Sequence, residues 1–197
     1  MRASSALLSC LGLLSVILAA GCAGTVKHMN TVAYVDTTPS ENEAVIVFLR
    51  ASGMGYGVQS AVYEVPESGP SRLVGIVAAK KKVAYRTSPG RHTFMVVGEN
   101  ADFMGADLLP GKVYFVVVQV RMGAWKARFG LYPVHGPERD QFRSWLGDAE
   151  WVETTHESLT WAHEHESEIE EKRAAYWAKW MTKQPMDRPV LWREDGL

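Results

Sequence analysis

Short apolar segments separated by Gly and Pro fill residues 43–135, and this pattern limits the possible folds more than any other feature of the chain. Eight segments have the length of a β-strand: 44–49, 60–65, 72–78, 82–87, 91–97, 101–109, 113–121 and 126–134. Short strands with turn residues between them are typical of sandwiches and barrels. The sequence therefore predicts a mainly β fold, an antiparallel β-sandwich of about eight strands.

Two of these segments also alternate in a way that predicts which face of the sheet fills the core. Large apolar residues recur at every second position, at Val113, Phe115 and Val117 and again at Phe129 and Leu131. Successive side chains of a strand point to opposite faces, so we expect these five side chains in the core.

Beyond Pro137 the pattern becomes helical. Helices are predicted over residues 138–146 and about 155–183, the second ending before Pro185. The predicted sandwich domain (43–135) is thus followed by a helical extension (136–197). The extension is acidic, with eight Lys and Arg against fourteen Asp and Glu over residues 138–197, whereas residues 23–137 carry twelve against eight.

The helical extension is rich in tryptophan, since five of the seven Trp residues lie between Trp145 and Trp180. Aromatic rings on a charged helix suit either docking on the sandwich, whose charge is opposite, or contact with another protein. Both alternatives stay open at the level of sequence. In either case Trp177 and Trp180 are candidate contact residues.

The N-terminus has the pattern of a secretory signal. Arg2 is followed by an apolar run from residue 6 to residue 20, too short for a membrane span. The run ends in Leu18-Ala19-Ala20-Gly21-Cys22, which resembles the lipobox of bacterial lipoproteins. The resemblance implies cleavage of a signal peptide (1–21), acylation of Cys22 with diacylglycerol and palmitate, and a lipidated tether (22–42).

An ordinary signal peptide, cleaved nearby to leave a free thiol on a secreted protein, is the alternative for this segment. The chain has two cysteines, and Cys10 lies inside the predicted signal, so a mature disulfide is excluded and acylation would consume the remaining thiol. Ala23 after the cysteine resembles the pattern that sorts lipoproteins to the outer membrane. We therefore expect a membrane-anchored lipoprotein of the bacterial cell envelope, in the outer membrane and facing the periplasm.

Several motifs within residues 43–135 resemble a family of small bacterial lipoprotein domains of unknown function. They include Arg50-Ala51-Ser52 after the first segment, Ser88-Pro89-Gly90-Arg91-His92, Leu109-Pro110-Gly111-Lys112, and Phe129-Gly130-Leu131-Tyr132. The turn chemistry is similar to that of PEGA domains and other transthyretin-like β-sandwiches. The resemblance implies a sandwich with no catalytic residues to transfer.

Two further segments are candidate binding sites. Met54 and Tyr56 lie in a Gly-rich connection, where a phosphate-binding loop is not expected because another strand follows it. Lys80, Lys81 and Lys82 lie at a predicted hairpin, where a solvated turn or contact with anionic lipid or lipopolysaccharide is expected. A nucleic-acid partner is not expected, because the domain is only mildly basic.

No motif predicts catalysis, a metal or a cofactor. His92 has no partner group in the sequence, and His163 and His165 do not face each other on a helix, so the cluster from His163 to Glu168 offers at most two ligands at a time. We expect a lipid-anchored binding or structural module without catalytic activity, whose partner is an envelope protein, peptidoglycan or lipopolysaccharide. The alternative is an envelope-polymer hydrolase using His92 or the His163–Glu168 cluster.

Overall fold

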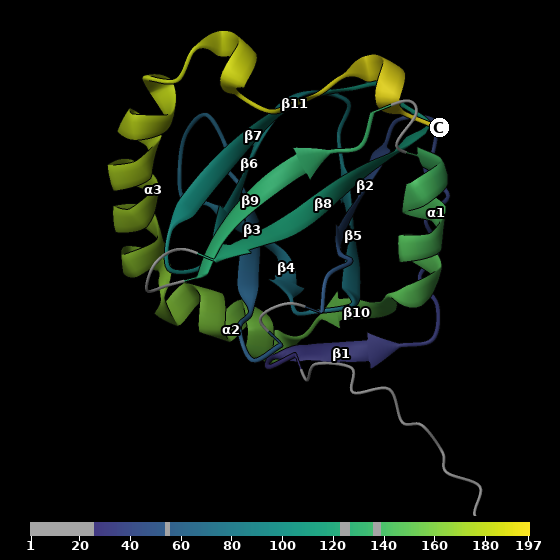
Figure 1. Cartoon of the computed structure of the whole chain (residues 1–197), viewed down its shortest axis with the longest axis horizontal. Coiled ribbons are helices and arrows are strands. Elements are labelled where there is room, and N and C mark those ends of the chain that lie inside the picture. The colour runs from purple at the N-terminus through teal and green to yellow at the C-terminus, as the bar shows by residue number, and fades with distance from the viewer. Residues whose placement is uncertain (1–25, 54–55, 123–126, 136–138) are drawn as a thin grey trace, which may run out of the picture.

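Two β-sheets face each other in the computed structural model, with helices at the periphery (Figure 1). The structure describes residues 26–53, 56–122, 127–135 and 139–197. The predicted signal peptide (1–21), the acylated Cys22 and the candidate residue Met54 lie outside the described residues. No helix in the described ranges is both long and apolar enough to span a membrane.

The first sheet contains six strands and mixes parallel with antiparallel pairs. Their spatial order is β1 (Met29–Val32), β10 (Glu150–Thr154), β5 (Lys81–Thr87), β2 (Ala44–Arg50), β8 (Lys112–Met122) and β9 (Ala127–Pro133). β10 runs parallel to β5, and β2 runs parallel to β8. The other neighbours in this sheet are antiparallel.

The second sheet has five strands. Their order is β11 (Val190–Leu191), β7 (Ala101–Leu108), β6 (Gly90–Val97), β3 (Ser60–Glu64) and β4 (Arg72–Val77). Only the short β11 runs parallel to its neighbour. The described chain also contains three α-helices, α1 (Arg139–Asp148), α2 (His156–Glu164) and α3 (Glu166–Met181), and two short 3₁₀ helices, η2 (Pro185–Asp187) and η3 (Arg193–Asp195).

The core lies between the two sheets and is built from the alternate side chains that face inward. Phe48 of the first sheet meets Phe94 of the second with ring centroids 5.3 Å apart, and both are fully buried. Tyr85 approaches the same Phe94 ring edge-on. Burial of such apolar area is the main favourable term in folding.

The predicted fold class is confirmed at the level of a mainly β protein with helices towards the C-terminus, and its finer form is wrong. The described residues hold eleven strands in two mixed sheets, not about eight in an antiparallel sandwich. The additional strands lie outside residues 43–135: β1 falls in the expected tether, and β10 and β11 fall in the expected helical extension. These segments, only two to five residues long, become strands because an edge of a sheet offers them unpaired backbone groups.

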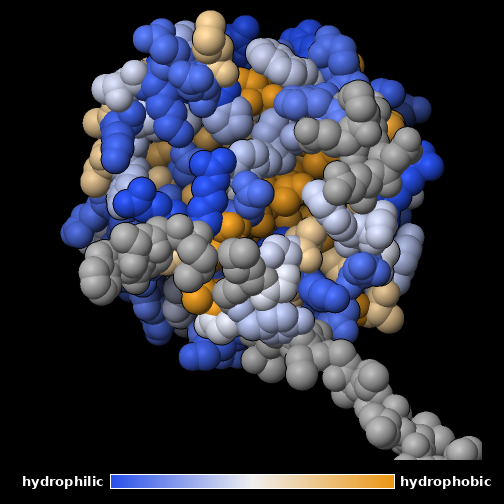
Figure 2. All heavy atoms as spheres, viewed as in Figure 1, coloured by the Kyte–Doolittle hydropathy of each residue, from blue (hydrophilic) through white to orange (hydrophobic). Residues whose placement is uncertain are grey.

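The predicted inward face is right for β9 and wrong for β8. Phe129 and Leu131 are buried in the main core, whereas Phe115 and Val117 point to the outer face of the first sheet. On that face Phe115 meets Phe142 of α1 at 4.9 Å, within a second apolar cluster. Figure 2 shows hydrophobic residues gathered in a hollow on this side of the molecule, over β8 and β9.

The long predicted helix exists but is divided into two. α2 and α3 meet at His165, whose φ and ψ of −102° and 7° depart from helical values. The His165 ring Nδ1 donates to the Trp161 carbonyl at 2.8 Å, and the His165 backbone N–H donates to the same oxygen at 3.1 Å. Side chains that compete for helical carbonyls weaken the ladder, and we attribute the bend, hereafter the elbow, to this contact.

Candidate functional site

α3 packs on the face of the second sheet that points away from the first sheet. Phe103 of β7 contacts Trp177 at 5.0 Å and Trp180 at 5.9 Å between ring centroids, and Ile169 joins the main core. Docking on the sandwich is therefore the alternative that the structure shows for this helix. Trp177 and Trp180 use ring area for that contact, so their predicted role towards a partner stays a prediction.

A cavity of about 380 Å³ opens where the elbow, the first residues of β3 and the start of the described chain meet. Its volume falls in the range of small-molecule sites. Its lining is apolar on the sheet side, with Ala61, Ile76 and Val97, and α3 adds the apolar Ile169. The rim is polar, with Lys27, His28, Gln59, His165, Glu168 and Lys172. We call this the elbow cavity.

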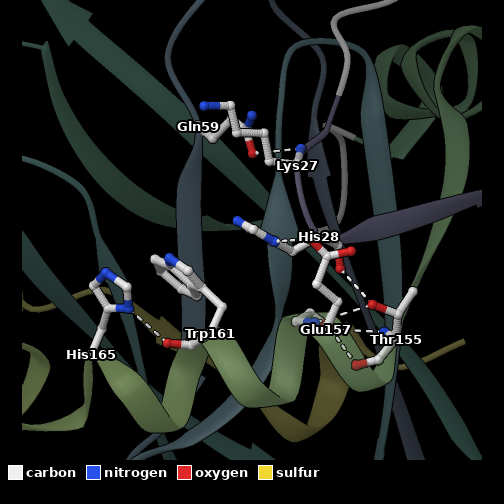
Figure 3. A network of polar contacts seen from close by, with 8 residues as sticks. Lys27, His28, Gln59, Thr155, Glu157, Trp161 and His165 are labelled. Carbon is white, nitrogen blue, oxygen red and sulfur yellow. Dashed lines mark hydrogen bonds and ion pairs between the residues drawn. The ribbon is translucent and has the colours of Figure 1, made fainter.

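Three rings line up along one side of the elbow cavity. Trp161 stacks on His165 with centroids 4.7 Å apart, and on its other side it stacks on His28 at 5.9 Å and 16° between planes (Figure 3). Trp161 and His165 are four residues apart, the spacing at which helical side chains meet. His28 comes from a segment more than a hundred residues away in the sequence.

Two contacts hold His28 in place, one to its backbone carbonyl and one to its ring. The Thr155 hydroxyl donates to the His28 carbonyl at 2.9 Å, and His28 Nδ1 lies 2.7 Å from Glu157 Oε1 (Figure 3). Thr155 also caps α2, forming a capping box with Ser158. His28 has a φ of +64°, a conformation that costs an L-residue ~1–2 kcal/mol. Strained residues held this firmly concentrate at functional sites.

Tyr63 contributes a buried hydroxyl to the elbow cavity. The side chain is 1% exposed, and within the part of the chain that the structure describes its hydroxyl has no hydrogen-bond partner. Burial raises the pKa of this hydroxyl above its usual range, with a smaller contribution from the charges of Glu168 and Glu170, so it stays a neutral donor. An unpaired buried hydroxyl costs about 1–3 kcal/mol, which a ligand acceptor would recover.

The charged part of the rim comes from the first turns of α3. Lys172 pairs with Glu168 at 2.9 Å and donates to the Gly98 carbonyl at 3.1 Å. The Lys172 ammonium hydrogen-bonds the Glu168 carboxylate and lowers its pKa. The elbow cavity therefore combines an apolar floor, one buried hydroxyl and a rim of both charge signs, an arrangement that accepts an apolar body with a polar end.

A second polar cluster lies at the opposite end of β3, between the sheets. Glu64 is buried; its carboxylate lies 2.6 Å from His92 Nδ1, accepts from the Tyr85 hydroxyl at 2.6 Å, and lies 3.2 Å from Arg72. Burial alone would raise the pKa of Glu64, but the hydrogen bonds from Tyr85 and His92 and the charge of Arg72 outweigh it and lower the pKa. Burial, and then the bond to Glu64, raises the pKa of Tyr85.

His92, one residue of the predicted hydrolase alternative, has both ring nitrogens engaged in this cluster. Nε2 lies 2.9 Å from the Ser88 carbonyl, which can only accept, and Nδ1 faces Glu64. The other residues of that alternative are spread around the elbow: His163 is exposed, with Nδ1 3.6 Å from Glu166, while His165 turns towards the elbow cavity. Among the described residues no three His, Cys, Asp or Glu side chains converge as a metal site.

The three consecutive lysines occupy different environments. Lys80 is exposed at the turn, with a φ of +55°. Lys81 is buried and pairs with Glu150 of β10, while the Lys82 ammonium donates to the Leu146 carbonyl and lies 4.5 Å from the centre of the Trp151 ring. Only Lys80 fits the expected solvated turn; the other two tie β5 to the C-terminal part of the chain.

The described part of the Gly-rich connection places Tyr56 on the surface, 40% exposed. Tyr56 is not among the residues that line the elbow cavity, although Gly57 is. The predicted role of Tyr56 in binding stays a prediction, and Met54 lies outside the described residues.

The two mixed sheets and the docked elbow define a mainly β protein with a cavity between a helix pair and a sheet. Comparison of the sequence with protein-family models and with curated proteins gives no match. The resemblance of residues 43–135 to small bacterial lipoprotein domains therefore stays a prediction.

Sequence reasoning missed the residues that form the elbow cavity. The sequence places His28 in the expected tether, Tyr63 in an apolar strand and Trp161 among the tryptophans of the helical extension, and nothing in it joins the three. The i, i+4 spacing of Trp161 and His165 was the one local signal of a ring pair. No local signal brings His28 to them, because that contact depends on β1 pairing with β10.

Proposed function

We propose that this protein is a lipid-anchored module of the bacterial cell envelope that binds another envelope component through the elbow cavity, without catalysis of its own. The observation that carries the proposal is the buried, unpartnered Tyr63 hydroxyl in a cavity with an apolar floor. Cys22 is the proposed lipid-bearing residue, and the outer membrane, facing the periplasm, is the proposed location. The lipobox resemblance supports both.

Binding has more support than hydrolysis. A histidine that acts as a general base needs a free ring nitrogen within reach of the substrate proton. Both nitrogens of His92 are used inside the chain, and the His92 side chain is only 10% exposed. The elbow cavity, in contrast, offers a donor whose hydrogen-bonding capacity is not used within the described chain.

The anchoring part of the proposal is tested by fractionating cells that express the full chain or its Cys22→Ala variant. The wild-type protein should stay with membranes after a high-salt wash, and the intact mass of the mature protein should show acyl chains. Cys22→Ala should lack the acyl mass and lose its membrane attachment. An unmodified Cys22 in the mature wild-type protein would contradict this part of the proposal.

The binding part is tested by photocrosslinking in living cells. A benzophenone amino acid placed at Lys27, on the rim of the elbow cavity, should form a defined adduct of one mass. A matched probe at Glu153, also exposed but not among the residues lining the cavity, should form none. Equal adduct patterns from the two positions would contradict a site at the elbow.

A further inference from the structure

A second hollow, distinct from the elbow cavity, lies where the edge strand β9 meets β7 and the C-terminal half of α3. Its volume is about 410 Å³, and it shares no lining residue with the elbow cavity. Four cationic residues line it: Arg121 of β8, Arg128 of β9, Lys179 of α3, and Lys183 just beyond α3. We call it the basic groove.

Most of the positive charge in the basic groove is not neutralised by the described chain. Asp102 is the one acidic residue in its lining, and it pairs with Lys183 at 3.1 Å. Within the described residues Arg121, Arg128 and Lys179 form no ion pair. Three cations in a concave site therefore attract an anion more strongly than the near-neutral chain as a whole does.

The two arginines are positioned against each other. Arg121 and Arg128 are direct cross-strand partners of the antiparallel β8–β9 pair. Like charges directly opposite each other destabilise a pair of strands. The Arg121 guanidinium is also fixed over the Tyr132 ring, 5.0 Å from its centroid. An anion bound by both guanidinium groups would remove the repulsion, and guanidinium forks match phosphate oxygens in pairs.

The unpaired cations of the basic groove and its buried indole can only donate hydrogen bonds. Trp180, which is 9% exposed, lines it, and the Trp180 indole N–H has no acceptor among the described residues. An indole N–H only donates, as do guanidinium and ammonium groups. A ligand that satisfies this set must present acceptors, and phosphate oxygens present only acceptors when ionised.

Aromatic surface lies beside the cations. Tyr132 and Tyr176 line the same groove, both half-buried, and offer ring area with a polar tip. Gly130 lets Asp102 and Tyr132 pack closely over the strand: a Cβ at that position would meet Asp102 Oδ2 and Tyr132 Cε2, each at 3.2 Å. Half-buried rings beside cations suit the flat, partly apolar face of a sugar.

We infer that the basic groove binds a phosphorylated sugar, with the phosphate between Arg121 and Arg128 and the sugar against Tyr176. The inference concerns a site separate from the elbow cavity and does not depend on it. Either a free sugar phosphate or the phosphorylated sugar headgroup of a glycolipid has this chemistry.

The test is calorimetric titration of the full chain with glucose 6-phosphate, glucose, inorganic phosphate, and vesicles with or without a phosphorylated glycolipid. If the free compound is the source, glucose 6-phosphate should bind more tightly than inorganic phosphate, and glucose should give no signal. If a glycolipid is the source, only the vesicles that contain it should bind. No binding in any arm at millimolar concentration, or equal affinity for glucose 6-phosphate and inorganic phosphate, would overturn the inference.

Matched variants tie the binding to the groove. Arg121→Gln and Arg128→Gln should each weaken binding by about tenfold or more, because each removes a charged hydrogen-bond donor. Arg91→Gln changes an exposed arginine of β6 that is not in the groove lining, and it should bind as the wild type does. Equal loss in all three variants, or none in either groove variant, would contradict the assignment.

Two further measurements separate loss of binding from loss of folding. Without ligand, Arg128→Gln should unfold at the same temperature as the wild type or higher, because it removes the like-charge pair. Trp180→Phe replaces the indole with a smaller aromatic ring that has no N–H, so binding should weaken by about tenfold while α3 stays docked. If the arginine variants unfold at a clearly lower temperature than the wild type, their weaker binding can be explained by loss of folding, and this result would count against a direct contact.

Discussion

Tyr63 and Glu64 are neighbours on β3, both are buried, and they face opposite sides of the second sheet. Glu64 points into the sandwich, where Tyr85, His92 and Arg72 all contact its carboxylate. Tyr63 points towards α3 and the elbow cavity, where its hydroxyl lacks a partner within the described chain. Paired buried groups stabilise a fold, whereas an unpaired one costs free energy and marks a place where a ligand would be accommodated.

The largest effect should follow the removal of the Glu64 carboxylate. Glu64→Ala leaves the polar groups of His92 and Tyr85 without their hydrogen-bond partner. The variant should lower the free energy of unfolding by about 3–5 kcal/mol. Urea denaturation measures it, with Glu67→Ala, an exposed position on the following turn, as the control. A loss no larger than in the control would show that the Glu64 cluster is not structural.

The charge of Glu64 should give a smaller, pH-dependent effect. Its pKa is lower in the folded protein than its ordinary value of 4.5, so the ionised carboxylate adds stability above that value. This contribution is lost as the pH falls through the folded pKa. Glu64→Gln should therefore be less stable than the wild type by about 1.5–3 kcal/mol at pH 7, with the difference shrinking as the pH falls below the ordinary value of 4.5. Urea denaturation of both proteins at pH 7 and below pH 4.5 measures the difference in free energy of unfolding. A difference that does not change with pH would contradict the prediction.

Tyr63→Phe should have the opposite sign. The variant keeps the ring and deletes the unpaired hydroxyl, so the free energy of unfolding should rise by about 1 kcal/mol or stay unchanged. At the same time the crosslink from the rim of the elbow cavity should weaken. Thermal unfolding and the crosslinking yield measure the two effects. A loss of stability above about 1 kcal/mol would mean that the hydroxyl has a structural partner.

The smallest effect is expected at the rim. Glu157→Gln removes the charge that faces His28 at 2.7 Å, but Glu157 is 72% exposed on its side chain. Exposed ion pairs contribute about 0.2–1 kcal/mol, so denaturation should detect little change. The pair orients the His28 ring against Trp161. The near-UV circular dichroism of the tryptophans should therefore change even though the stability hardly does. An unchanged spectrum would mean that the ring pair does not depend on Glu157.

The sequence predicted the strands that carry strong apolar runs and could not predict the rest. β2, β3 and β6 are apolar enough to be recognised locally, but β1, β10 and β11 are short and exist only because neighbouring strands accept their backbone groups. The inward face of β8 could not be chosen, because residues 113–118 are apolar at every position. A shift of one residue exchanges the two faces.

The elbow cavity depends on contacts that no local pattern contains. Its walls come from residues 27–28, 57–63, 76, 97–98 and 161–172. We attribute the elbow itself to the His165 side chain, which shares the Trp161 carbonyl with its own backbone N–H. The sequence did predict a strand at Tyr63 and a helix at Trp161, but it did not predict that the helix would pack beside the strand.

The most direct test of binding at the elbow is native mass spectrometry of the full chain released gently from membranes. The wild-type protein should carry a non-covalent ligand of defined mass. Ala61→Leu, which places extra apolar volume on the floor of the elbow cavity, and Tyr63→Phe should lose most of that ligand while retaining their acyl chains. A wild-type protein without bound mass, or a ligand retained equally by both variants, would contradict the proposal that Tyr63 and the elbow cavity form a binding site.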